Sequence, residues 1–143
     1  MAEAPEVELR IPCDPQYISV VRLVVAGIGA RVGLTVDEID DMKVAVSEAC
    51  TNTIDHAFPS DESASKPVPI TIRFVPREGE LRIEVEDVGQ GFEPDRVIAE
   101  SREQPSVEGG LGLYLIRQLA DSVEVQSAPG SGTKVIMTKR SAR

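Results

Sequence analysis

The chain has 143 residues, of which 41% are hydrophobic, and this suits one compact domain with its own core. Its formal net charge of −9 argues against direct binding to the phosphate backbone of a nucleic acid. There is neither an apolar run of the roughly 20 residues that span a bilayer nor a basic start followed by an apolar stretch, so we expect a cytoplasmic protein without a membrane partner.

A strand and a helix are predicted first. Residues 7–11 alternate between apolar and charged side chains, which is the period of a half-buried strand. Asp14 and Pro15 then favour a helix start, as N-cap and first helical residue, and this helix is expected to stop at Gly33.

A second, longer helix follows. Thr35 and Glu38 form the T-x-x-E pattern of a capping box, which indicates a helix N-terminus. The helix is expected to cover 36–57, with small and apolar residues on one face.

The second half of the chain predicts two hairpins and a third helix. Segments 70–74 and 81–85 alternate on either side of a turn and indicate an antiparallel hairpin. A charged stretch over 92–110 is long enough to be functional, and a helix over 111–120 and a hairpin over 123–137 follow it. The whole order predicts an α+β fold: a two-layer α/β sandwich with about three helices on one face of a mostly antiparallel mixed sheet.

Polar residues on the second helix predict a cation site. Glu48, Asn52 and Asp55 fall within one narrow arc beside the apolar face of the helix. A carboxylate and an amide one turn apart offer oxygen ligands of the kind that Mg²⁺ accepts, with phosphates and water completing its shell. The same spacing is also typical of a solvated helix face.

An acidic residue at the end of the predicted strand 81–85 is aimed inward. Asp87 shares the alternation of the core-facing residues of that strand, and Gly89 and Gly91 follow it. A buried carboxylate needs hydrogen-bond donors, which the exocyclic amine of a purine would supply, and the glycines would allow a flat ring to approach. Alternatively, Asp87 only begins a turn.

Two further segments add to this picture. Gly110 and Gly112 flank Leu111 at the start of the third helix, where free amide hydrogens and the helix dipole favour phosphate oxygens. Thr133 begins the last strand on its inward face, so its hydroxyl is able to reach the same pocket. Taken alone, the glycines also suit a loop exit, and the threonine an ordinary hairpin.

Together the four motifs resemble a known family. E-x-x-x-N, D-x-G-x-G, G-G-x-G-L and G-T-x-V occur in the order found in the ATP-binding fold (the Bergerat or GHKL fold) of histidine kinases, gyrases, Hsp90 and MutL. Within that superfamily, VSEACTNTIDHAF and EGGLGLYLIRQLAD are especially similar to the small anti-sigma factors with serine kinase activity, of the RsbW and SpoIIAB type. The resemblance covers nearly the whole chain and implies one domain over 1–143.

The resemblance implies roles on the second helix and in the pocket. Asn52 would hold magnesium, and Glu48 would act on the attacking serine hydroxyl as a general base or orienting group. Asp87 would recognise the adenine amine of ATP, with Gly89 and Gly91 shaping the pocket.

The remaining site residues are placed by the same resemblance. Gly110, Leu111 and Gly112 would lie over the phosphates, and Thr133 would join the aspartate near the adenine through water. Residues 92–110 would form a lid over the nucleotide. Asp55 is grouped with these nucleotide-binding residues, or it is simply solvated.

The implied function has two parts. Proteins of this type form homodimers, sequester a sigma factor, and phosphorylate a serine of an anti-anti-sigma (STAS) protein, in pathways such as the stress response or sporulation. One alternative is a nucleotide-gated regulator that transfers no phosphate, although retention of Glu48 argues against it. A second is a switch kinase of the same fold that acts on a scaffold protein. A simple ATPase is disfavoured by the small size, and the P-loop and H-R-D or D-F-G motifs of other kinases are absent.

Overall fold

The computed structural model describes residues 5–54, 69–87, 110–127 and 132–142, and at positions 110 and 111 it describes the backbone alone. Three α-helices, a short 3₁₀ helix and five strands occur in these ranges. In chain order they are β1 (Val7–Ile11), η1 (Pro15–Tyr17), α1 (Ile18–Arg31), α2 (Val36–Asn52), β2 (Ile70–Arg77), β3 (Glu80–Asp87), α4 (Gly110–Leu119), β4 (Ser122–Ser127) and β5 (Thr133–Arg140).

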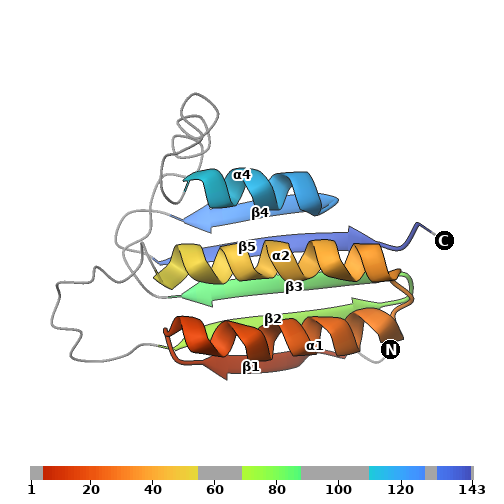
Figure 1. The fold of residues 1–143 in the computed structure, drawn as a ribbon, viewed down its shortest axis with the longest axis horizontal. Coiled ribbons are helices and arrows are strands. Elements are labelled where there is room, and N and C mark those ends of the chain that lie inside the picture. Colours follow the sequence, from red (N-terminus) through yellow and green to blue (C-terminus); the bar gives the residue numbers. More distant parts are fainter. Residues whose placement is uncertain (1–4, 55–68, 88–109, 128–131, 143) are drawn as a thin grey trace, which may run out of the picture.

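The strands form one sheet, and the helices cover one of its faces (Figure 1). The strand order is β1-β2-β3-β5-β4, and each of the described neighbouring pairs is antiparallel. The two-layer α/β sandwich predicted from the sequence is therefore confirmed. Among the described helices, none has the length and apolar character to cross a membrane.

The hydrophobic core lies between the two layers. Alternate residues of β2, β3 and β5 point toward the helices, as the period-2 patterns predicted, and α2 and α4 pack against them and against each other. Complete burial of each large apolar side chain contributes about 1.5–3 kcal/mol to folding. The largest fully buried side chains are Phe74, Met42, Ile70, Ile72, Leu81, Ile83, Leu113, Ile116 and Met137.

Both helix starts predicted from the sequence are found, but Asp14 caps the short 3₁₀ helix η1 and not α1 itself. Asp14 accepts a hydrogen bond from the Gln16 amide and opens the 3₁₀ turn η1, which then leads into α1. At α2 the capping box is complete: Thr35 Oγ1 accepts from the Glu38 amide at 3.1 Å, and Glu38 Oε1 accepts from the Thr35 amide at 2.7 Å. The two bonds satisfy donors that the first helical turn leaves open.

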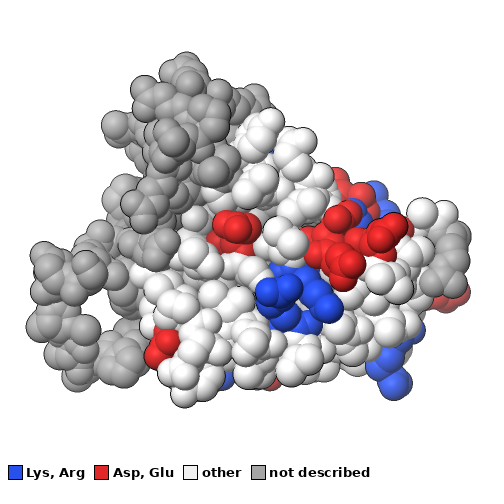
Figure 2. Space-filling model, viewed as in Figure 1, with Lys and Arg blue, Asp and Glu red and all other residues white. Residues whose placement is uncertain are grey.

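Acidic side chains gather over the first part of α2 on the helical face of the molecule (Figure 2). Asp37 and Glu38 lie in the first turn, where the positive end of the helix dipole favours them. The α-helix itself ends at Asn52, and Thr53 and Ile54 continue in π-helical geometry. The expected continuation to residue 57 lies outside the described residues.

Lys139 fastens the end of α4 to its neighbours. Its Nζ donates to the carbonyl oxygen of Leu119 at 2.7 Å and to Asp41 Oδ2 at 3.3 Å, and its side chain is only 12% exposed. One largely buried ammonium group therefore joins the C-terminal turn of α4, α2 and β5. The position is favourable because the last carbonyls of a helix attract a cation.

Candidate functional site

The described site residues predicted from the sequence gather at one edge of the sandwich. At this edge α2 and β3 end, and α4 and β5 begin (Figure 1). Glu48, Asn52, Asp87, Gly112 and Thr133 lie on these segments. Asp55, Gly89, Gly91 and almost all of the expected lid 92–110 lie outside the described residues, and Gly110 and Leu111 form the first turn of α4.

Asn52 and Gly112, which belong to two separate sequence motifs, are in direct contact. A Cβ atom built on Gly112 would lie 2.9 Å from Asn52 Oδ1 and 3.0 Å from Asn52 Nδ2. Real Cβ atoms essentially never come closer than 3.0 Å to such an atom. Glycine at this position therefore lets the first turn of α4 rest against the carboxamide at the end of α2.

The carboxamide of Asn52 keeps hydrogen-bonding capacity for a ligand. Its Nδ2 atom is buried, and no described residue accepts a hydrogen bond from it. Leaving such a group unsatisfied costs about 1–3 kcal/mol, so a buried orphan amide in a folded protein calls for an explanation. A ligand bound at the junction of α2 and α4 would supply one.

Glu48 lies one turn before Asn52 on the same helix. Its side chain is half-buried, whereas the nearby Ala45 and Ala49 on the core face of the helix are fully buried. Glu48 therefore lies at the border between the core face of α2 and the solvent. Residues at i and i+4 are neighbours on a helix surface, so the carboxylate and the carboxamide share the flank of α2. The arc predicted from the sequence is present for these two residues.

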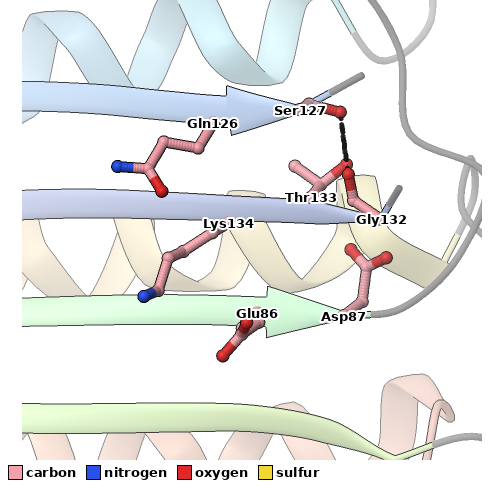
Figure 3. A pocket seen from close by; sticks show the side chains of 7 residues that line it. All are labelled: Glu86, Asp87, Gln126, Ser127, Gly132, Thr133 and Lys134. Carbon is pink, nitrogen blue, oxygen red and sulfur yellow. Dashed lines mark hydrogen bonds between the residues drawn. The ribbon is translucent and has the colours of Figure 1, made fainter. Parts of the chain in front are cut away.

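Asp87 and Thr133 form part of a polar row across three strands. They are Cα partners between β3 and β5, and Thr133 is in turn the partner of Ser127 on β4. Asp87 is 4% exposed and Thr133 8%, so both take the inward orientation that their parity predicted. Figure 3 shows the carboxylate of Asp87 directed toward the start of β5.

A pocket of about 360 Å³ opens at the ends of these strands, within the roughly 300–1,000 Å³ typical of small-molecule sites. Sequence reasoning found Asp87 and Thr133 but missed the other lining residues. Register was the usable signal, because pairing 133 with 127 across the last hairpin places Ser127 beside the predicted threonine. The pocket is lined by Glu86, Asp87, Gln126, Ser127, Gly132, Thr133 and Lys134.

Ion pairs hold the charged wall of the pocket. Arg73 Nη1 lies 2.7 Å from Glu86 Oε1, and this hydrogen bond raises the pKa of the guanidinium above its ordinary value. Lys134 Nζ lies 3.4 Å from Glu84 Oε1, and Glu84 is also paired with Arg82 at 2.7 Å. These partners occupy the outer face of the sheet, so the inner wall, with Asp87 and Thr133, is the side that faces the helices.

Comparison with known proteins matches this arrangement to a family. The sequence profile of the histidine kinase-like ATPase domain matches residues 11–139. The serine-protein kinase RsbW of Bacillus velezensis is 42% identical over 141 residues, covering 93% of this chain and 84% of the relative. RsbW of Bacillus subtilis is 40% identical over 144 residues, covering 95% and 86%.

Solved structures give the same fold. A crystal structure of the RsbU and RsbW domains of a Mycobacterium tuberculosis protein aligns with a TM-score of 0.63 at 22% identity, over 97% of this chain and 33% of that one. The chain belongs to the histidine kinase-like ATPase domain family and, within it, to the RsbW serine-protein kinases. This confirms the resemblance predicted from the motifs and, with it, the use of ATP.

Proposed function

We propose that this protein is an ATP-dependent protein serine kinase and anti-sigma factor, which sequesters a sigma factor and phosphorylates a serine of an anti-anti-sigma (STAS) protein. The observation that carries the proposal is the contact between Asn52 and Gly112, because it joins a polar helix end to a glycine-rich helix start. The RsbW kinases at about 40% identity support it.

ATP would lie along this edge with its base at the strands and its phosphates at the helices. The buried Asp87 carboxylate would accept a hydrogen bond from the adenine amine, with Thr133 beside it. The amides of Gly110, Leu111 and Gly112 at the start of α4 would face the phosphates. Gly89, Gly91 and a lid over 92–110 would complete the enclosure within one domain spanning 1–143.

Magnesium fits the helical half of the site. Asn52 would hold it through the carboxamide oxygen Oδ1, a ligand of the kind that Mg²⁺ accepts, while the buried Nδ2, which has no hydrogen-bond partner among the described residues, would donate to a phosphate oxygen. Asp55, one further turn along the sequence, would stand beside it. When bound with ATP, Mg²⁺ neutralises charge on the phosphate oxygens while most of its ligands remain phosphates and water.

Glu48 would assist the attacking serine of the partner protein. As the serine oxygen bonds to the γ-phosphorus, the bond from that phosphorus to the bridging oxygen breaks and ADP leaves. The Glu48 carboxylate would orient the serine hydroxyl and take its proton, while the helix amides steady the phosphates. Such a reaction depends mainly on positioning and charge neutralisation, which these few groups are able to provide.

The partners and setting follow from the same proposal. We expect a cytoplasmic homodimer that contacts neither nucleic acid nor membrane, and whose nucleotide state decides which partner is held. The alternatives are a nucleotide-gated regulator without catalysis and a switch kinase that acts on a scaffold protein. The position of Glu48, one turn from Asn52, favours a catalyst over a regulator that only binds.

The test follows the label from γ-labelled ATP, with Mg²⁺, to a purified anti-anti-sigma protein. We expect transfer by the wild type and a loss of at least about 100-fold in Glu48→Ala, in line with general base contributions of 10²–10⁴, with ATP affinity retained. Asp40→Ala, an exposed acid on the same helix, is the matched control and should transfer normally. Tight Mg²⁺-ATP binding without transfer would replace the kinase by the non-catalytic regulator.

A further inference from the structure

We propose that Ser127 is a positioning residue that fixes the direction of the Thr133 hydroxyl and thereby strengthens the selection of adenine over guanine nucleotides. The inference rests on the proposed function, because it assumes that the pocket at the ends of β3, β4 and β5 holds the nucleotide base. It concerns a residue that none of the four sequence motifs includes.

The geometry places the two hydroxyls in one hydrogen-bonded chain. Ser127 is the last residue of β4 and the cross-strand partner of Thr133. Its Oγ lies 2.8 Å from Thr133 Oγ1 and donates to the Gly132 carbonyl oxygen at 3.1 Å. Figure 3 shows the link beside the Asp87 carboxylate, at the end of the pocket.

The number of available protons determines which hydroxyl donates in the hydrogen bond between Ser127 and Thr133. A hydroxyl has a single proton and a carbonyl oxygen only accepts, so the Ser127 proton is the one shared with Gly132. In the bond between the two hydroxyls, Thr133 must then be the donor and Ser127 the acceptor. The remaining lone pairs of Thr133 Oγ1 are left to act as acceptors toward the pocket.

This direction matters because of the neighbour across the sheet. Asp87 is the Cα partner of Thr133 on β3, and its ionised carboxylate also only accepts. The pocket thus offers two adjacent acceptors, which match the two hydrogens of the adenine amine, directly or through water. Guanine carries a carbonyl oxygen at the same position, and this acceptor would meet two others.

The last hairpin provides its own control. Ser122 is the first residue of β4 and pairs with Thr138, so the same two residue types face each other at the far end of the same ladder. Ser122 is exposed, whereas Ser127 is half-buried and lines the pocket. Ser122 lies on the opposite, exposed face of β4, so Ser122→Ala removes a serine hydroxyl from the same strand without touching the pocket.

The experiment measures the affinities for ATP and GTP in Mg²⁺, by competition against a fluorescent ATP analogue. In Ser127→Ala the Thr133 proton is free to turn into the pocket, so ATP affinity should fall about fivefold, the size of one neutral hydrogen bond. GTP should bind equally well or better, which lowers the ATP:GTP ratio by about five- to tenfold. Ser122→Ala should leave both affinities unchanged, and Ser127→Thr should restore the ratio.

A double-mutant cycle tests whether Ser127 acts through its neighbour. In a Thr133→Val background, Ser127→Ala should have no further effect on the ATP:GTP ratio. A ratio unchanged in Ser127→Ala, or a shift that persists without the threonine, would overturn the inference. If Ser127→Ala does not fold, Ser127→Cys, whose sulfur is only a weak acceptor for the Thr133 proton, should show the same drop, and an unchanged ratio there also overturns the inference.

The outcomes separate this inference from the function on which it rests. A wild type that binds no ATP would sink the proposed function itself. A wild type that binds ATP and prefers it to GTP, with that preference intact in Ser127→Ala, would sink the role of Ser127 alone.

Discussion

Replacing Gly112 with alanine is expected to separate nucleotide binding from stability. The new methyl group would stand 2.9 Å from Asn52 Oδ1 and 3.2 Å from Asn52 Cγ, so the carboxamide has to move. The atoms in the way belong to the end of a side chain and not to the backbone, so the two helices need not come apart. We therefore expect the substitution to displace the Asn52 side chain and to leave the packing of the two helices largely unchanged.

Two opposing terms set the change in stability. Alanine is favoured over glycine inside a helix by about 0.8–1 kcal/mol, whereas overpacking costs about 1–3 kcal/mol and least where a side chain is able to yield. The free energy of unfolding should therefore fall by no more than about 1 kcal/mol. A ligand displaced by about 1 Å loses far more function than that, so Mg²⁺-ATP affinity should drop about 10- to 100-fold.

Urea denaturation and calorimetric titration measure the two quantities on the same samples. Gly27→Ala is the matched control, because a Cβ at this exposed site in α1 meets no atom within 4 Å. It should stabilise the protein by about 0.5–1 kcal/mol and leave nucleotide affinity unchanged. Chelating the magnesium should shrink the defect of Gly112→Ala, since Asn52 is proposed to act through the metal. Wild-type affinity in Gly112→Ala, in the presence of Mg²⁺, would refute the reasoning.

Two further predictions concern stability at the far end of the sandwich. Lys139→Met removes a charged donor 2.7 Å from the Leu119 carbonyl oxygen and should lower the free energy of unfolding in urea by about 1.5–3 kcal/mol. The Arg140 side chain is 66% exposed, so Arg140→Met should change the free energy of unfolding by less than about 1 kcal/mol. Equal losses of stability in the two variants would contradict the role of Lys139 in holding the end of α4. Hydrogen bonding from the Thr35 amide, foremost among its causes, lowers the pKa of Glu38 below the ordinary value of 4.5. The stabilisation by ionised Glu38 is present above pH 4.5 and is lost as the pH falls through the folded pKa. In Glu38→Gln the free energy of unfolding should therefore fall less steeply between neutral and acidic pH. Parallel curves of unfolding free energy against pH for the two proteins would exclude this role of Glu38.

Local chemistry made most of the fold predictable. Strand alternation over 70–74 and 81–85 and the capping box at Thr35 depend on neighbours in the sequence, and the structure confirms them. The strand order β1-β2-β3-β5-β4 was not predictable in this way, because β3 pairs with β5 across a helix and another strand. Such pairing is decided by the burial of a shared face, which no single segment reveals.

The candidate site shows the same division. The inward orientation of Asp87 was predictable from the alternation of β3 alone, because every second residue of a strand lies on the same face, and its burial confirms it. The contact of Asn52 with Gly112 depends instead on how α2 and α4 pack, and the motifs gave no distance between them. Ser127 was missed because one serine at a strand end is typical of a surface, and only register places it beside Thr133.

The two halves of the site lie on different layers, and the core between them fixes their separation. Asp87, Thr133 and Ser127 are held by the antiparallel ladder of the sheet, which is rigid in register. Asn52 and Gly112 are held by helices, and α4 is fastened to its neighbours at its other end by Lys139. A nucleotide that touches both halves must therefore stabilise the packing of α4 on the sheet. By the same linkage, a change that loosens the far end of α4 should weaken binding at the near end without touching the ligand.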